Sequence, residues 1–117
     1  MSQRRVVVTG LGIISPVGNT VEAAWNSVLE GKSGIGAITR FDCSDFSTRI
    51  AGEIRNFDAS EFIPAKDARK MDAFMHYGIA ACKQAIADSG IEVTDRNSSR
   101  IGVAFGSGIG GIETIEV

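Results

Sequence analysis

The first candidate for binding chemistry is a glycine-rich segment near the end of the chain. Gly106, Gly108 and Gly111 follow a short apolar run in the spacing G-x-G-x-x-G. In dinucleotide-binding turns this spacing lets backbone N–H groups hold a pyrophosphate at a helix N-terminus. No acidic residue ends a second strand about 20 residues further on, where a ribose contact is expected. Two alternatives therefore stay open for these glycines: close backbone packing, or a loop that lines a ligand channel.

Three cations form a second candidate site. Lys66, Arg69 and Lys70 are spaced i, i+3 and i+4, so they share one face of a helix. We expect them in the first turns of a long helix, where exposed cations oppose the helix dipole by about 0.3–1 kcal/mol each. They form either a solvated face softened by Asp67 and Asp72, or a docking surface for an acidic or phosphorylated partner.

The reactive side chains offer little for catalysis. The chain has two cysteines, Cys43 and Cys82, and one histidine, His76. Cys82 falls on the apolar stripe of a predicted helix and is expected to be a packed core thiol, and Cys43 has no basic neighbour in sequence. A nucleophilic cysteine needs such a base, and three soft ligands do not fill a closed zinc shell. We therefore predict neither a cysteine nucleophile nor a metal site.

Strands and helices that alternate along the chain must position these residues. Residues 5–9 and 101–105 are apolar runs that predict buried strands, and residues 47–54 half alternate as a strand does. Helices are predicted at residues 21–29, capped by Asn19 or Thr20 and followed by Gly31, and at residues 66–89, ended by Gly90. Residues 58–61 predict a short helical turn. This order indicates an α/β layered fold with an at least partly parallel sheet.

Composition excludes several classes of protein. Of the 117 residues, 44% are hydrophobic and 22% are charged, as in ordinary globular domains, so wholesale disorder is not expected. A net charge of −2 gives no general attraction to nucleic acid or to an anionic membrane. The apolar run near Met1 is too short for an export signal or a membrane span. We therefore expect a cytoplasmic protein with free thiols.

Several segments, in one order and spacing along the chain, resemble a known family. They are residues 4–19 (RRVVVTGLGIISPVGN), Trp25, residues 31–35 (GKSGI), residues 69–74 (RKMDAF), Tyr77 with Gly78, residues 88–90 (DSG), residues 100–103 (RIGV) and residues 106–111 (GSGIGG). Together they resemble the β-ketoacyl-acyl carrier protein synthases, particularly the type II enzyme of bacterial fatty-acid synthesis.

The resemblance implies a fold and a reaction. The family has the thiolase-like fold, in which two similar α/β halves form a five-layered αβαβα sandwich, and it works as a homodimer without a cofactor. It transfers an acyl chain from acyl carrier protein to a cysteine and condenses it with malonyl-acyl carrier protein, releasing carbon dioxide. Residues 1–117 would then be an incomplete N-terminal domain. The family's cysteine and two histidines come later in the chain, so no catalytic residue is assigned here.

Two family features match positions in this sequence. Lys66, Arg69 and Lys70 match the basic helix that docks the acidic carrier protein. Ile109 matches a residue at the floor of the fatty-acyl pocket that gates entry of the acyl chain. Two other functions stay open: a nucleotide-binding α/β domain, and a non-catalytic relative such as a chain-length factor, which lacks the cysteine.

Overall fold

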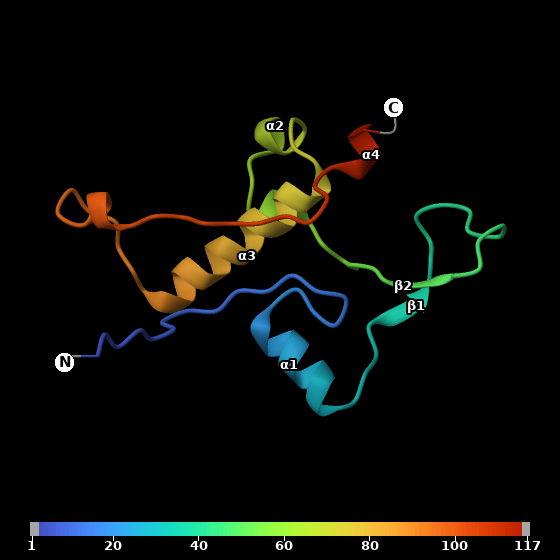
Figure 1. Cartoon of the computed structure of the whole chain (residues 1–117), viewed down its shortest axis with the longest axis horizontal. Helices are drawn as coiled ribbons and strands as arrows, with labels where there is room; N and C mark the ends of the chain where they lie inside the picture. Colours follow the sequence, from blue (N-terminus) through green and yellow to red (C-terminus); the bar gives the residue numbers. More distant parts are fainter. Residues whose placement is uncertain (1–2, 116–117) are drawn as a thin grey trace.

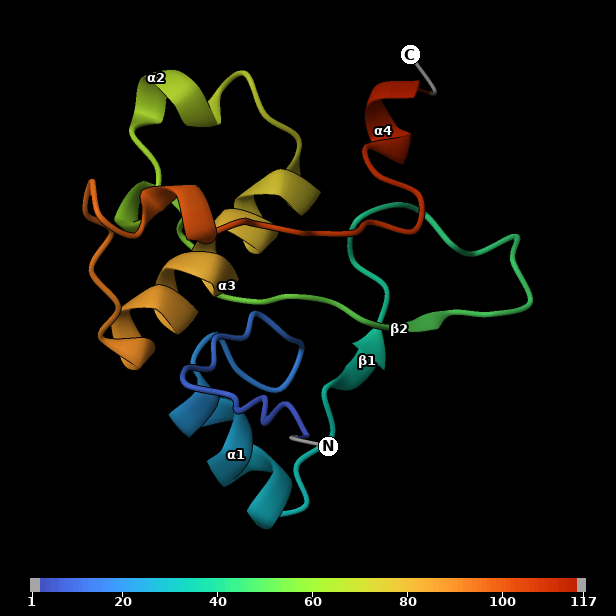
Figure 2. The same cartoon turned by 60° about the vertical axis from the view of Figure 1, so that its left-hand side comes forward.

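The computed structural model describes residues 3–115 and contains helices joined by long extended segments, with one small sheet (Figure 1). In chain order the elements are α1 (Val21–Leu29), β1 (Ile35–Ala37), β2 (Ile50–Gly52), α2 (Ala65–Ala68), α3 (Ala73–Ser89) and α4 (Ile112–Ile115), with 3₁₀ turns at Ala59–Glu61 and Ser98–Arg100. The longest helix, α3, lies centrally and is flanked by segments from both ends of the chain (Figure 2). Among the described helices, none is long and apolar enough to cross a membrane.

Helix α1 forms where the sequence predicts it. Thr20 is its N-cap, and the Thr20 hydroxyl accepts a hydrogen bond from the Ala23 amide at 3.1 Å. Asn19, the other predicted cap, instead donates through its side-chain amide to the Arg55 carbonyl oxygen at 2.7 Å. Gly31 follows the helix with a left-handed φ of 67°, as its predicted position after the helix end requires.

The helix predicted at residues 66–89 is wrong at its start. The structure divides it into α2 and α3, because Asp72 has an extended backbone (φ −72°, ψ 160°) and becomes the N-cap of α3. The Ala68 carbonyl at the end of α2 accepts hydrogen bonds from the Met71 amide at 3.2 Å and from the His76 ring at 2.8 Å. These contacts stabilise the end of α2 by satisfying a terminal carbonyl group. The predicted end of α3 at Gly90 is confirmed.

The sheet consists of β1 and β2, which pair in an antiparallel register with Ile35 opposite Gly52 and Ala37 opposite Ile50. The strand predicted at residues 47–54 is thus confirmed in its central part. The connection between the two strands is fastened by Glu53, whose carboxylate accepts hydrogen bonds from the amides of Thr39 at 3.1 Å and Arg40 at 3.3 Å.

The strands predicted at residues 5–9 and 101–105 are wrong for the described structure. Both segments run extended, but within residues 3–115 neither pairs with a strand, and the one sheet there is antiparallel rather than parallel. A strand needs a neighbouring strand to receive its backbone hydrogen bonds. Val6 and Val103 remain 91% and 82% exposed, so these apolar segments are covered by no second layer.

Residues 10–13 lie directly on α3. A Cβ atom at Gly12 would stand 1.9 Å from the Ala81 carbonyl oxygen, and one at Gly10 would stand 2.2 Å from that of Ala85. Only glycine allows two backbones to approach so closely. Close packing of two backbones therefore explains why glycine occupies both positions.

Side chains of α3 hold the same segment by hydrogen bonds. The Leu11 amide donates to Asp88 at 2.9 Å, and the Ile13 amide donates to the side-chain oxygen of Gln84 at 3.2 Å. The Gln84 side chain also donates to the Asn19 carbonyl oxygen at 2.7 Å. Alternate amides of an extended backbone point to one side, so two side chains one helical turn apart can bind both of them.

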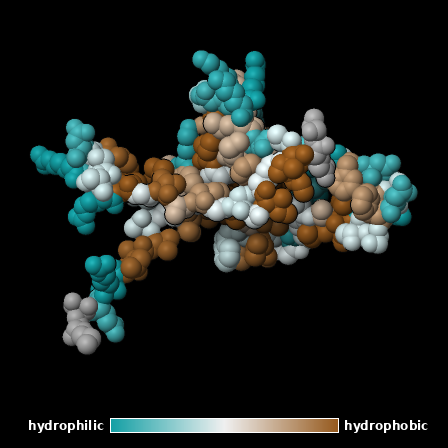
Figure 3. All heavy atoms as spheres, turned by 45° about the horizontal axis from the view of Figure 1, so that its top comes forward, coloured by the Kyte–Doolittle hydropathy of each residue, from teal (hydrophilic) through white to brown (hydrophobic). Residues whose placement is uncertain are grey.

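The described residues enclose little core. Their buried apolar side chains are those of Ala24, Ile63 and Ala80. The accessible surface is 9630 Å², whereas a compact protein of 12.4 kDa exposes about 6,100 Å². The radius of gyration is 17.6 Å, against about 13 Å for a compact chain of this length. Figure 3 shows hydrophobic side chains spread over the visible face.

We predict that residues 1–117, produced alone, unfold without a cooperative transition, because the exposed apolar surface leaves too little packing energy. Scanning calorimetry should lack the heat-absorption peak of about 80 kcal/mol that a compact domain of this size produces. A hydrophobic dye such as ANS should bind at low temperature. A single sharp transition of the monomer, with equal calorimetric and van't Hoff enthalpies, would contradict the prediction.

Candidate functional site

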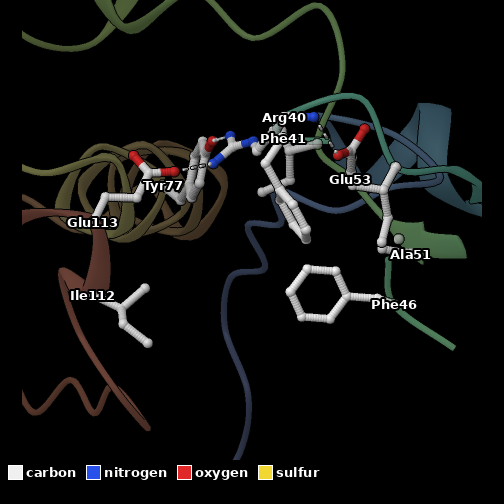
Figure 4. A pocket seen from close by; sticks show the side chains of 11 residues that line it. Arg40, Phe41, Phe46, Ala51, Glu53, Tyr77, Ile112 and Glu113 are labelled. Carbon is white, nitrogen blue, oxygen red and sulfur yellow. Dashed lines mark hydrogen bonds and ion pairs between the residues drawn. The ribbon is translucent and has the colours of Figure 1, made fainter. Parts of the chain in front are cut away.

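A cavity of about 660 Å³ opens between the β1–β2 connection, the start of α3 and the turn α4 (Figure 4). Phe41 and Phe46 line it from the β1–β2 side, and Ile112 lines it from the opposite side. Its polar groups gather at one edge, where Arg40, Tyr77 and the neighbouring glutamates lie. An apolar wall with a few polar groups at its edge is typical of small-molecule sites.

Arg40 joins three separate elements at this edge. Its guanidinium donates to the Tyr77 hydroxyl on α3 at 2.8 Å and lies 3.6 Å from the Glu113 carboxylate on α4. The hydrogen bond to Tyr77 raises the pKa of Arg40 above its ordinary value, and Glu113 and Glu53 add to the effect. Arg40 is therefore a permanent cation that ties the β1–β2 connection to both helices.

Glu53 is held as a carboxylate from the other side of Arg40. The Thr39 hydroxyl donates to it at 2.8 Å, in addition to the two amide hydrogen bonds described above. Hydrogen bonds from Thr39, with a smaller contribution from Arg40, lower the pKa of Glu53 below its ordinary value. Arg40 and Glu53 therefore form a pair of fixed opposite charges at this edge at neutral pH.

The glycine-rich loop approaches the cavity from the C-terminal side. The Gly110 amide donates to the Ser107 hydroxyl at 3.0 Å, which closes a turn around Ile109. Ile109 is 73% exposed, and the cavity is lined by Ile112 and Glu113, which follow the loop, rather than by Ile109 itself. The loop therefore lies next to a ligand-sized space, with Ile109 outside it.

A second apolar groove, of about 390 Å³, runs between α3 and the extended residues 103–105. Phe74, Met75 and Cys82 contribute to one wall, and Phe105 contributes to the other. Phe105 packs over Gly78, where a Cβ atom would stand 2.9 Å from its ring. Cys82 is half-buried in this groove, so it borders apolar space instead of lying in a closed core.

The three predicted basic residues are exposed together, but not in the expected place. Lys66 lies in the last turn of α2, Arg69 is the C-cap of that helix, and Lys70 follows it. Arg69 and Lys70 therefore lie at the C-terminal end of α2, where cations are favourable to the helix dipole, and Lys66 lies within the single turn of that helix. Within residues 3–115 none of the three forms an ion pair. We call these three residues the basic surface.

The structure does not join the histidine to either cysteine by a hydrogen bond within the described residues. The His76 ring is engaged by the Ala68 carbonyl, and no hydrogen bond joins it to Cys43 or Cys82, which are both free thiols. Among the described residues, no group of three or more His, Cys, Asp or Glu side chains could hold a metal ion. The geometry thus supports binding and positioning, and it supplies no nucleophile with its base.

Sequence reasoning missed the residues around Arg40 and the contact between Asp72 and Thr114. Asp72 accepts a hydrogen bond from the Thr114 hydroxyl at 2.5 Å, across 42 residues of sequence. Arg40 and Tyr77 are 37 residues apart. A single sequence carries no periodic pattern for such isolated long-range pairs, so only the fold reveals them.

Comparison with known proteins identifies the family. The family model described as "Beta-ketoacyl synthase, N-terminal domain" matches residues 3–117. A 3-oxoacyl-[acyl-carrier-protein] synthase 2 of Vibrio harveyi is 60% identical over 116 residues, which are 99% of this chain and 28% of that protein. The protein of the same name from Staphylococcus aureus (strain N315) is 47% identical over 118 residues, covering 100% of this chain and 28% of that protein.

A solved structure agrees with these matches. "The ishigamide ketosynthase/chain length factor" is 35% identical, with a TM-score of 0.67, and the match covers 78% of this chain and 23% of that one. The predicted thiolase-like fold class is confirmed by the family match and by this neighbour. This chain spans 28% of the length of the curated relatives that it matches. The chain belongs to the β-ketoacyl synthase family, because its residues 3–117 match the model of that family's N-terminal domain.

Proposed function

We propose that this chain is the N-terminal part of a 3-oxoacyl-[acyl-carrier-protein] synthase, which lengthens an enzyme-bound acyl chain by condensation with malonyl-acyl carrier protein. The observation that carries the proposal is the family match over residues 3–117, together with 60% identity to the Vibrio harveyi relative of that name. Identity at this level along the whole matched segment supports a shared reaction.

Within that enzyme the residues of this sequence would bind and position substrates, and none of them is assigned a role in forming the new carbon–carbon bond. His76 is engaged by a backbone carbonyl, and among the described residues no hydrogen bond joins either free cysteine to His76. The nucleophilic cysteine and the two histidines of the reaction are therefore assigned to residues outside this sequence. No cofactor is proposed.

The basic surface is the proposed docking site for acyl carrier protein, an acidic partner. Lys66, Arg69 and Lys70 are exposed and form no ion pair within residues 3–115, so their charges are available to a partner. His76 fastens the end of α2 to α3 through Ala68. The cations thus stand on an anchored turn, and charge-assisted hydrogen bonds to carboxylate or phosphate groups favour docking there.

Ile109 is the proposed gate of the acyl pocket. It is an exposed apolar residue in the turn that Ser107 closes, three residues before Ile112, which lines the first cavity. Gly110 passes close to Phe74, which lines the second apolar groove: a Cβ atom at Gly110 would stand 3.7 Å from the Phe74 ring. An isoleucine in this position can restrict entry to a neighbouring apolar space.

The active enzyme is further proposed to be a cytoplasmic homodimer, as the family resemblance implies. The large exposed apolar side chains, including those of Val6 and Val103, support burial against further chain or a second subunit.

A second candidate is a non-catalytic relative, because a neighbouring solved structure contains a chain-length factor. An acylation assay on the protein expressed from the gene that encodes this sequence should discriminate the two functions. A synthase should gain the mass of one acyl group on a cysteine when incubated with acyl-loaded carrier protein, and should then elongate it with the malonyl form. Absence of acylation, with the carrier protein still bound, would favour the non-catalytic relative.

The docking proposal predicts the effect of charge reversal. We use a chimeric synthase in which residues 1–117 replace the matching segment of the Vibrio harveyi relative. Lys66→Glu with Arg69→Glu should weaken carrier-protein binding by about tenfold and flatten its dependence on salt, since exposed charge pairs contribute up to about 1 kcal/mol each. The control is Arg96→Glu with Arg100→Glu, an equal charge change on another exposed turn, which should leave affinity unchanged. Equal affinities of all three proteins across a salt titration would argue against docking at the basic surface.

The gate proposal predicts a dependence on acyl-chain length. In the chimeric synthase, Ile109→Phe should lower kcat/KM for long acyl chains by about tenfold relative to short ones, because the larger ring narrows the pocket. Ile109→Val, which keeps a small branched side chain, should retain the original length profile. Equal slowing at every chain length would rule out the gate assignment.

A further inference from the structure

Asp72 stands where a helix cap is expected, but its carboxylate is engaged elsewhere. It occupies the N-cap position of α3, and its side chain makes no capping hydrogen bond to that helix. Its Oδ1 instead accepts a hydrogen bond from the Thr114 hydroxyl on α4 at 2.5 Å. The carboxylate still lies beside the first turn of α3. A hydrogen bond to a carboxylate is charge-assisted and stronger than one between two neutral groups.

The backbone of the glycine-rich loop passes close to the same carboxylate. A Cβ atom at Gly111 would stand 1.7 Å from the Asp72 Oδ2, so the loop backbone passes directly over the carboxylate. Gly110 has a left-handed φ of 77°, which turns the chain toward that contact. The turn closed by Ser107 and Gly110 therefore leaves Ile109 only two residues from a point anchored on α3.

A second tie acts on the same side of the loop. Glu113, the residue before Thr114, lies 3.6 Å from the Arg40 guanidinium, and Arg40 is itself bonded to Tyr77 on α3. The ion pair between Arg40 and Glu113 is exposed, so it stabilises the position of α4 less than the hydrogen bond to Asp72 does. Both ties connect the segment after the loop to the first turns of α3.

We propose that Asp72 is a positioning residue: by holding Thr114 at the point where the Gly111 backbone passes its carboxylate, it fixes the exit of the glycine-rich loop and thereby the place of Ile109. The inference rests on the proposed function, since Ile109 matters there as the gate for acyl chains. A loop without this anchor samples more positions, and a gate that moves discriminates less between acyl chains.

The test removes one hydroxyl and leaves the carboxylate in place. Thr114→Val in the chimeric synthase keeps the shape of an exposed side chain and should leave the melting temperature unchanged. Deuterium uptake by the amides of residues 106–111, followed by mass spectrometry, should become about fivefold faster, as expected for loss of one hydrogen bond. The ratio of kcat/KM between the preferred and a non-preferred chain length should fall by about threefold.

Matched variants separate positioning from general damage. Thr114→Ser restores the hydroxyl and should rescue both the slow exchange and the length preference. Thr39→Val removes the other threonine–carboxylate hydrogen bond, that to Glu53, and should leave exchange in residues 106–111 unaltered. Asp72→Ala combined with Thr114→Val should have no larger effect on loop exchange than Asp72→Ala alone, because both changes break one contact.

The outcomes distinguish this inference from the proposed function. Unchanged exchange in Thr114→Val overturns the positioning role of Asp72. Faster exchange with an unchanged length preference also overturns it, provided that Ile109→Phe alters the preference. If Ile109→Phe leaves the preference unaltered, the gate assignment fails, and the exchange data alone then decide whether Asp72 holds the loop.

Discussion

The close approach of two backbones at Gly10 and Gly12 is the constraint on which the described arrangement depends. Any side chain at either position would overlap a carbonyl oxygen of α3. The approach lets Gln84 and Asp88 bind the amides of Ile13 and Leu11. Side chains of α3 thus accept backbone hydrogen bonds that a neighbouring strand would accept in a sheet. The N-terminal segment, α1 and α3 consequently hold together although very few side chains are buried.

Polar contacts to α3 organise the opposite end of the molecule in the same way. Arg40 brings the β1–β2 connection to Tyr77, and Asp72 brings the turn after the glycine-rich loop to the start of the helix. His76 fastens α2, which carries the basic surface. The segments that carry the proposed docking surface and the proposed gate are therefore both attached to the same helix, α3. Under the proposed function, this common support would fix the proposed docking point relative to the proposed gate.

Local patterns predicted the elements that depend on neighbouring residues. Thr20 caps α1, Gly90 ends α3, and Asp58 caps the 3₁₀ turn at Ala59–Glu61 by accepting a hydrogen bond from the Ser60 amide at 2.8 Å. The break between α2 and α3 could not be predicted from spacing, because the apolar and basic periodicity continues through it. Residues 5–9 and 101–105 are apolar and extended as predicted, but a strand forms only where a partner receives its backbone hydrogen bonds, and the predicted parallel sheet is not formed within residues 3–115.

The sequence by itself determined the family, helix α1 with its cap, the C-terminal end of α3, and the residues that form the basic surface and the tip of the glycine-rich loop. Each of these depends on residue types at short spacing, or on several such segments occurring in one order. Only the tertiary structure decided that Arg69 and Lys70 lie at the end of α2. It also decided that Arg40 donates a hydrogen bond to Tyr77 and pairs with Glu113. Asp72 accepts a hydrogen bond from Thr114 instead of capping its own helix, which again depends on the fold. These contacts join residues far apart in the chain, and the energy of each depends on a distance that no local pattern encodes.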